Sequence, residues 1–162
     1  MTSALPPLSV VLDTNVVLDL YVFEDPATRV LWEALEAGRV VAWVEEGMLA
    51  ELGYVLASRN FLRGREVEAR RTALERYRAR ARLLREGEGA PVAELPRCKD
   101  RDDQRFLVLA ARARVDWLVS KDKRVLSMAD RREMPFAILT LRQAVARLET
   151  PARAGGAIER VS

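Results

Sequence analysis

The chain has 162 residues, of which 49% are hydrophobic and 31% charged, and it carries a formal net charge of +3. This length suits one domain with a single hydrophobic core, and the mildly basic balance is only a weak indication of a polyanionic partner. The sequence contains no histidine, which excludes Ser-His-Asp and Cys-His catalysis and zinc sites with histidine ligands. Any hydrolytic chemistry would therefore depend on carboxylates, hydroxyls, lysine or a bound metal ion.

Three features of the sequence indicate the cellular compartment. Cys98 is the only cysteine, so the chain cannot form an internal disulfide and a reducing compartment is expected. The N-terminal stretch lacks the charged, apolar and small-residue order of a signal peptide. No apolar run approaches the roughly 20 residues that are needed to span a bilayer. We therefore expect a cytoplasmic protein without a membrane segment.

The first apolar run of the chain ends at a carboxylate. Residues 8–12 are rich in β-branched side chains, which predicts a buried parallel strand, and Asp13 follows directly. Ligands of open α/β sheets bind just beyond the carboxyl ends of such strands. Asp13 is therefore either a ligand-binding residue or the cap of the next helix.

The remaining apolar patterns alternate between strand and helix periodicity. The expected strands after the first are residues 40–44, 115–120 and 136–139, with a short edge strand around Val92. The expected helices are residues 16–21, a helix that begins at Asp25-Pro26 and stops at Gly38, and residues 45–58, 65–85, 102–113, 123–128 and 141–148. This alternation predicts a parallel sheet with helices on both faces. Residues 1–148 are expected to form one domain, followed by a flexible C-terminal tail over residues 149–162.

Four acidic residues stand where chemistry could take place. Asp122 follows the strand expected at 115–120, so it would reach the same sheet edge as Asp13 if the two strands are parallel. Asp103 begins a helix in phase with its inward-facing residues, and Glu51 flanks the apolar face of its own helix. Taken singly, each has an ordinary explanation in helix capping, the helix dipole or outward extension of the side chain.

As a group, these carboxylates indicate a bound cation. Several ionised carboxylates within a few ångströms repel one another, so some would protonate unless a cation lies among them. Hard divalent cations such as Mg²⁺ or Mn²⁺ choose oxygen ligands, whereas the usual zinc ligands are nearly absent from this chain. An all-carboxylate metal site in a basic protein suggests a polyanionic substrate whose phosphate the metal would bind.

Four segments carry a resemblance to a known family. They are Val11-Leu12-Asp13-Thr14-Asn15-Val16, Met48-Leu49-Ala50-Glu51-Leu52 with Val55-Leu56, Cys98-Lys99-Asp100-Arg101-Asp102-Asp103-Gln104-Arg105-Phe106-Leu107, and Asp116-Trp117-Leu118-Val119-Ser120-Lys121-Asp122. Each segment alone is a weak signal, but the ordered set is fairly specific. Over residues 8 to about 148 the sequence resembles PIN-domain ribonucleases, and among them the bacterial and archaeal PIN proteins regarded as toxins of toxin–antitoxin pairs.

The resemblance implies a three-layer α/β/α sandwich with a central, mostly parallel sheet. It further implies Mg²⁺- or Mn²⁺-dependent cleavage of RNA. The residues that it places in the catalytic metal site are Asp13, Glu51, Asp103 and Asp122, with supporting roles for Asn15, Ser120, Asp102 and Lys121. An RNA substrate, an antitoxin protein and a second copy of the chain in a homodimer are the partners that it implies.

Two positions near the expected metal site need a choice. Asp102 adjoins Asp103, and we assign Asp103 to the site because it is in phase with Phe106, while Asp102 is the better N-cap candidate and Asp100 is expected in the preceding loop. Lys121 stands where the family often has glycine. A cation at this position would either contact the substrate phosphate or screen the acids.

The arginine-rich segment at residues 64–86 could line the path of the RNA. Its candidate RNA-binding residues are Arg65, Arg70, Arg78 and Arg82. Phosphate contacts of this kind give a steep salt dependence and little sequence selectivity. The alternative is a solvated helix whose arginines pair with glutamates.

Two other functions remain open. Phosphoryl-transfer enzymes of the haloacid-dehalogenase or receiver type also place an aspartate after the first strand, with a later lysine and acid, as Lys121 and Asp122 would be. The phosphatases among them need a second aspartate two positions on, where this chain has Asn15. The other is a non-catalytic PIN-like scaffold that binds RNA or a protein partner, and the intact set of acids argues against it.

Overall fold

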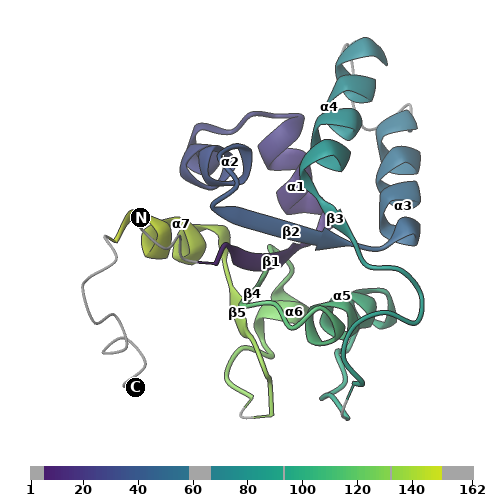
Figure 1. Cartoon of the computed structure of the whole chain (residues 1–162), viewed down its shortest axis with the longest axis vertical. Helices are drawn as coiled ribbons and strands as arrows, with labels where there is room; N and C mark the ends of the chain where they lie inside the picture. Colours follow the sequence, from purple (N-terminus) through teal and green to yellow (C-terminus); the bar gives the residue numbers. More distant parts are fainter. Residues whose placement is uncertain (1–5, 59–66, 93, 132, 151–162) are drawn as a thin grey trace.

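A parallel β-sheet with helices on both faces forms the body of the protein (Figure 1). The computed structural model describes residues 6–58, 67–92, 94–131 and 133–150. Its strands are β1 (Leu8–Leu12), β2 (Val40–Val44), β3 (Arg82–Leu83), β4 (Trp117–Val119) and β5 (Ala137–Leu139). Its helices are α1 (Thr14–Tyr21), α2 (Arg29–Glu36), α3 (Glu46–Ala57), α4 (Val67–Arg80), α5 (Arg101–Arg112), α6 (Lys123–Leu126) and α7 (Leu141–Glu149), with a 3₁₀ turn η1 (Pro26–Thr28) before α2.

The central strand of the sheet is β1. The strand order is β3-β2-β1-β4-β5, and every neighbouring pair is parallel. Leu12 of β1 is in register with Val119 of β4, so the carboxyl ends of these two strands lie side by side. Parallel strands need long crossover connections, which the helices supply here. The chain therefore leaves β1 and β4 at the same edge of the sheet, where ligands bind in open α/β folds.

Helices cover β1 from both sides. Val10 and Leu12 belong to a core cluster with residues of α1, α2, α3, α4 and α7. Val11 points to the opposite face, as alternate strand residues do, and packs with residues of α5 and α6. Figure 1 shows α1, α2 and α4 on one side of the sheet and α5 and α6 on the other. The expected three-layer α/β/α sandwich with a parallel central sheet is thus confirmed.

The arginine-rich segment differs from its prediction. The helix expected to residue 85 ends at Arg80, and the chain then forms β3 beside β2. The N–H of Leu84 donates to the carbonyl of Val44 at 2.8 Å, and the Leu84 side chain is buried. The edge strand expected around Val92 is wrong, because Val92 and the described residues beside it form no strand, and β3 is the edge strand next to β2.

The last helix, α7, begins with a capping box in which Thr140 and Gln143 each accept a backbone N–H of the other. It extends to Glu149, and residues 151–162 of the expected tail lie outside the described residues. None of the helices in the described ranges is long and apolar enough to cross a membrane.

Candidate metal centre

Two parallel strands bring aspartates to the same edge of the sheet. Asp13 follows β1, and Asp122 lies shortly after β4. Each caps the helix that starts there: Asp13 Oδ1 accepts the Val16 N–H at 2.9 Å, and Asp122 Oδ1 accepts the Arg124 N–H at 2.7 Å. Each cap uses one carboxylate oxygen, so capping and a role in ligand binding are compatible.

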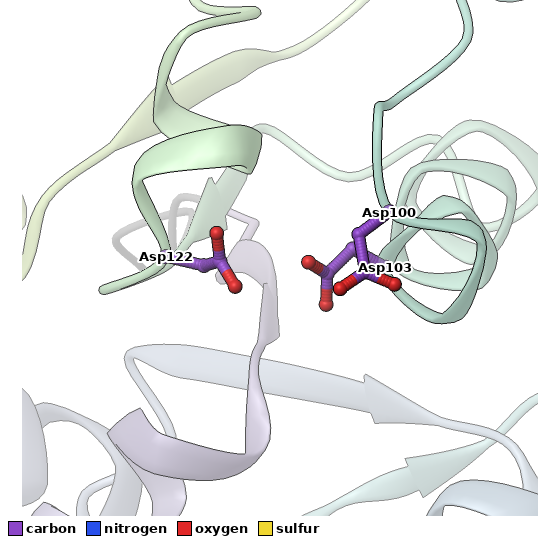
Figure 2. A group of neighbouring side chains, drawn as sticks. All are labelled: Asp100, Asp103 and Asp122. Atoms are coloured by element: carbon purple, nitrogen blue, oxygen red, sulfur yellow. The ribbon is translucent and has the colours of Figure 1, made fainter.

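Asp122 faces two aspartates at the start of α5, as Figure 2 shows. Asp100, Asp103 and Asp122 each contribute one carboxylate oxygen to a set whose members lie within 4.8 Å of one another. All three residues are partly buried. Such a set of oxygen atoms suits Mg²⁺ or Mn²⁺, which prefer carboxylate ligands. We refer to these three residues as the acidic group.

The start of α5 places two of these acids together. Asp100 is the N-cap of α5, and its Oδ1 accepts the Asp102 N–H at 2.9 Å. Asp103 is three residues further on, and residues at this spacing are neighbours on a helix. Asp102 is exposed and lies outside the acidic group. Of the adjacent pair, the structure therefore brings Asp103 to Asp122.

Two expectations about this helix start are wrong. Asp100, expected in the loop, is the N-cap and a member of the acidic group, whereas Asp102, expected as the N-cap, is in the first helical turn. The spacing of Asp100 and Asp103 is the signal in the sequence that could have identified Asp100 as a member of the acidic group. An N-cap residue and the third helical residue face each other, as they do in a capping box.

The acidic group is electrostatically unfavourable without a cation. Burial raises the pKa of Asp103 to about 6, and Asp122, Asp100 and Asp13 act in the same direction. The Oδ2 atom of Asp103 is buried and has no hydrogen-bond partner among the described residues. A divalent cation among these oxygens would remove the repulsion and give the orphaned oxygen a partner. The residues therefore fit a metal ion.

Asp13 adjoins the acidic group and is linked to it through Ser120. The Asp13 carboxylate is buried, and its Oδ2 accepts the Ser120 hydroxyl at 2.5 Å and the Lys121 N–H at 2.9 Å. The Ser120 Oγ in turn accepts the Asp122 N–H at 3.0 Å. Ser120 therefore sets the position of Asp13 relative to Asp122.

Two basic side chains at this edge of the sheet are paired. Arg124 Nη1 lies 2.6 Å from Asp100 Oδ2, so one oxygen of the acidic group already has a cationic partner. Lys121 Nζ lies 2.7 Å from Asp19 Oδ2 on α1. Because the Asp19 carboxylate is buried, Lys121 compensates its charge. Lys121 is therefore engaged by Asp19 and not by the acidic group.

Glu51 and Asn15 are not part of the acidic group. Glu51, on α3, forms an ion pair with Nη2 of Arg105 on α5. The guanidinium carbon of Arg105 also lies 5.3 Å from the centroid of the Phe106 ring. Asn15 is exposed in the first turn of α1. The sequence gives no signal for the pairing of Glu51, because α3 and α5 meet only in the folded chain.

The candidate RNA-binding arginines have varied positions. Arg78, on α4, lies 3.4 Å from Glu46 in an exposed ion pair. Arg82 is exposed on the edge strand β3. Arg65 lies outside the described residues, and the side chain of Arg70 is not described. The solvated helix with arginine–glutamate pairs is thus the better description of Arg78.

The fold and the acidic group define an α/β protein with a candidate divalent-metal site at the carboxyl edge of its sheet. Residues 9–124 match the profile of the PIN domain, which covers most of the chain. The chain therefore belongs to the PIN domain family, whose members are generally metal-dependent nucleases. This membership agrees with the chemistry that the carboxylates indicate.

A solved structure supports the same fold. The crystal structure of PAE2754 from Pyrobaculum aerophilum is similar to this chain with a TM-score of 0.57 and 15% sequence identity. The similarity covers 87% of this chain and 89% of that chain. At this identity the likeness concerns the fold alone. No curated protein matches the chain.

Proposed function

We propose that the protein is an endoribonuclease that requires Mg²⁺ or Mn²⁺ and hydrolyses phosphodiester bonds of RNA. The observation that carries this proposal is the acidic group, in which Asp103 combines a raised pKa with a buried, unpartnered oxygen. Membership of the PIN domain family supports metal-dependent nuclease chemistry. A phosphodiester substrate also suits a chain with a net charge of +3.

The proposed roles follow from the contacts of each residue. Asp103 and Asp122 would hold the metal, and Asp100 would add a third oxygen while Arg124 keeps its other oxygen occupied. The bound metal would stabilise charge on the scissile phosphate and acidify a bound water. Asp13 would add negative charge beside this centre and, through Ser120, hold Asp122 in place.

A carboxylate must also accept the proton of the attacking water. Asp103 suits this role because the acidic group uses one oxygen of each carboxylate, which leaves a second Asp103 oxygen beside the metal site to accept a proton. Glu51 would join the centre only after its ion pair with Arg105 opens. We therefore assign the proton transfer to Asp103.

A phospho-aspartate mechanism at Asp13 has less support. Both oxygens of Asp13 accept hydrogen bonds from within the protein, three in all. The residue two positions later is the exposed Asn15, where the phosphatases of this type need a second aspartate. Attack by Asp13 on a phosphoryl group would disrupt the hydrogen bonds that order this edge of the sheet.

We further propose that the protein is the toxin of a toxin–antitoxin pair, forms a homodimer and acts in the cytoplasm. The resemblance of the four sequence segments supports the toxin role, and the single cysteine accords with a reducing compartment. Induced expression should arrest growth, whereas expression of the Asp122→Asn variant should not. Equal growth of cells that express either form would contradict the toxin role.

The nuclease activity is tested with a labelled single-stranded RNA. We expect cleavage by the wild type in Mn²⁺ or Mg²⁺ and none in EDTA. Asp122→Asn, which can still cap α6, should lower the rate about 100-fold because a metal ligand is lost. The matched control is Asp102→Asn, an exposed neighbour outside the acidic group, which should retain the wild-type rate.

Circular dichroism of each variant checks that it is folded. Equal rates of cleavage for the wild type and Asp122→Asn would show that the acidic group has no role in the reaction. A folded wild type that binds RNA but never cleaves it would show a non-catalytic scaffold instead.

A further inference from the structure

A cavity of about 670 Å³ lies beside the first turns of α5. The segment that leads into α5, the helix itself and the loop after α6 form its walls. Both loops lie at the end of the molecule opposite α4 (Figure 1). Sites for small molecules and nucleotides commonly have volumes of about 300–1,000 Å³. The cavity is therefore large enough for one nucleotide unit.

One wall of this cavity is held rigidly against α5. The Gln104 side chain accepts the Cys98 N–H at 2.6 Å and donates to the Pro96 carbonyl at 3.4 Å. Cys98 is buried in the core cluster under α5, and Leu95 packs against the same cluster. The wall thus presents a fixed surface to a ligand, which lowers the entropy cost of binding.

Three arginines converge on the cavity without ion-pair partners. Arg97, Arg101 and Arg131 line it, are exposed, and form no ion pair with any residue that the structure describes. Glu94 and Glu133 also line it, so the charged residues of the cavity have an excess of one positive charge. On α4, by contrast, Arg76, Arg78 and Arg80 each pair with a glutamate.

The cavity begins next to the acidic group. Arg101 lies between Asp100 and Asp103 in the chain, and Gln104 directly follows Asp103. Successive helical residues are about 100° apart around the axis, so Gln104 and Asp103 lie on adjoining faces of the same turn. A single strand whose scissile phosphate is at the acidic group would therefore reach the cavity with a neighbouring nucleotide.

We propose that this cavity binds the nucleotide next to the scissile phosphate of single-stranded RNA. Arg97, Arg101 and Arg131 contact the phosphates and present guanidinium planes on which a base can stack. The apolar side chains of Leu95 and Val108 cover the ribose and the other face of the base. This inference rests on the proposed function and places the substrate on the α5–α6 side instead of along α4.

Binding without cleavage tests the proposal directly. The full chain in EDTA is titrated into a fluorescent single-stranded oligoribonucleotide, and anisotropy gives Kd at several salt concentrations. Arg97→Ala/Arg131→Ala should raise Kd about tenfold and reduce the slope of log Kd against log salt by about 1.4, since each phosphate contact to a single strand contributes about 0.7. Arg78→Ala/Arg80→Ala removes the same charge from α4 and should leave Kd within about twofold.

A photoreactive oligoribonucleotide containing 4-thiouridine locates the base. Cross-links to peptides that contain Leu95, Val108 or Arg131 support the cavity, and cross-links confined to α4 overturn it. Equal weakening by the two double variants would also overturn it, because the effect would then be that of net charge alone.

The outcome for the cavity is separable from that for the nuclease. If Arg97→Ala/Arg131→Ala loses RNA binding and the wild type never cleaves RNA, the proposal for the cavity stands and the proposed nuclease activity is wrong. If that variant binds RNA as tightly as the wild type and cleavage depends on Asp122, the proposal for the cavity is wrong and the proposed nuclease activity stands.

Discussion

Acidic residues and arginines lie on both sides of the sheet, but their pairing differs between the two sides. On the α3–α4 side, Arg78 pairs with Glu46, as neighbouring arginines pair with other glutamates. On the α5–α6 side, Asp103 and Asp122 face each other, and Arg131 belongs to a cavity whose arginines have no ion-pair partner among the described residues. Charges that are compensated within the chain leave little for a ligand to gain. Grouped like charges, by contrast, require a partner from outside.

This contrast shows why a count of arginines is a poor guide to the RNA path. The segment from Val67 to Arg80 is the most arginine-rich helix of the described chain. Three of its arginines, however, form ion pairs with glutamates. The cavity beside the acidic group has fewer arginines, but Arg97, Arg101 and Arg131 form no ion pair with a described residue and remain available to an anion. Pairing, which depends on the fold, decides where a polyanion can bind.

The largest change in stability should come from Ser120, which links the two strand ends. Ser120→Ala removes one of the two hydrogen bonds to the buried Oδ2 of Asp13 and the hydrogen bond of the Asp122 N–H. The free energy of unfolding should fall by about 1–3 kcal/mol. Metal affinity should fall about 10-fold or more because the orientation of Asp122 is lost. Urea unfolding and Mn²⁺ titration measure the two effects.

Ser127→Ala is the matched control for this change. The Ser127 hydroxyl is exposed and bonds only to the Arg124 carbonyl, at 2.7 Å, so its loss should change stability by less than about 0.5 kcal/mol. If Ser120→Ala is as stable as Ser127→Ala and binds Mn²⁺ as tightly as the wild type, Ser120 does not organise the site.

An intermediate effect is expected from pH. Because the pKa of Asp103 is raised to about 6 in the folded protein, the native state keeps a proton that the unfolded chain loses near its ordinary pKa of about 4. The contribution of Asp103 to stability is therefore greatest below about pH 4 and is lost as the pH rises to about 6. In EDTA, the unfolding free energy of the wild type relative to Asp103→Asn should fall across this window.

Saturating Mn²⁺ should abolish this fall, because a cation stabilises the ionised carboxylate. A difference between wild type and Asp103→Asn that stays constant over the same pH range, in EDTA, would show that the acidic group is not electrostatically strained. The comparison with Asp103→Asn subtracts the contributions of all other titrating groups, which both proteins share.

The smallest effect should follow from breaking a compensated pair. In the ion pair of Arg78 and Glu46 the side chains are 58% and 70% exposed. Exposed pairs of this kind contribute little, so Arg78→Ala should cost less than about 0.5 kcal/mol on urea unfolding. RNA affinity should stay unchanged. A clear loss of RNA affinity in this variant would place RNA on α4 and erase the contrast between the two sides.

Much of the fold could be predicted because its central strands have a strong local signal. The apolar runs Val10–Leu12 of β1 and Trp117–Val119 of β4 are buried, and each is a continuous apolar segment in the sequence. Their parallel pairing then accounts for the meeting of Asp13 and Asp122 at one edge. The strand β3 could not be predicted, because two residues are too few to show a periodicity.

The ion-pair partners of the candidate site residues could not be predicted from sequence patterns. Glu51 was expected among the acids, but Arg105 meets it from another helix. Lys121 was expected to face phosphate or the acids, but it compensates the buried Asp19. Helical spacing shows which residues share a face, whereas the partner across an interface depends on how the helices pack.

The most direct measurement for the whole account is calorimetric titration of Mn²⁺ into the metal-free protein. We predict saturable binding by the wild type and by Asp102→Asn, and affinities about 10- to 100-fold weaker for Asp103→Asn and Asp122→Asn. A wild type that takes up no Mn²⁺, or an Asp122→Asn variant that binds it as tightly as the wild type, would contradict the claim that the acidic group holds a divalent cation.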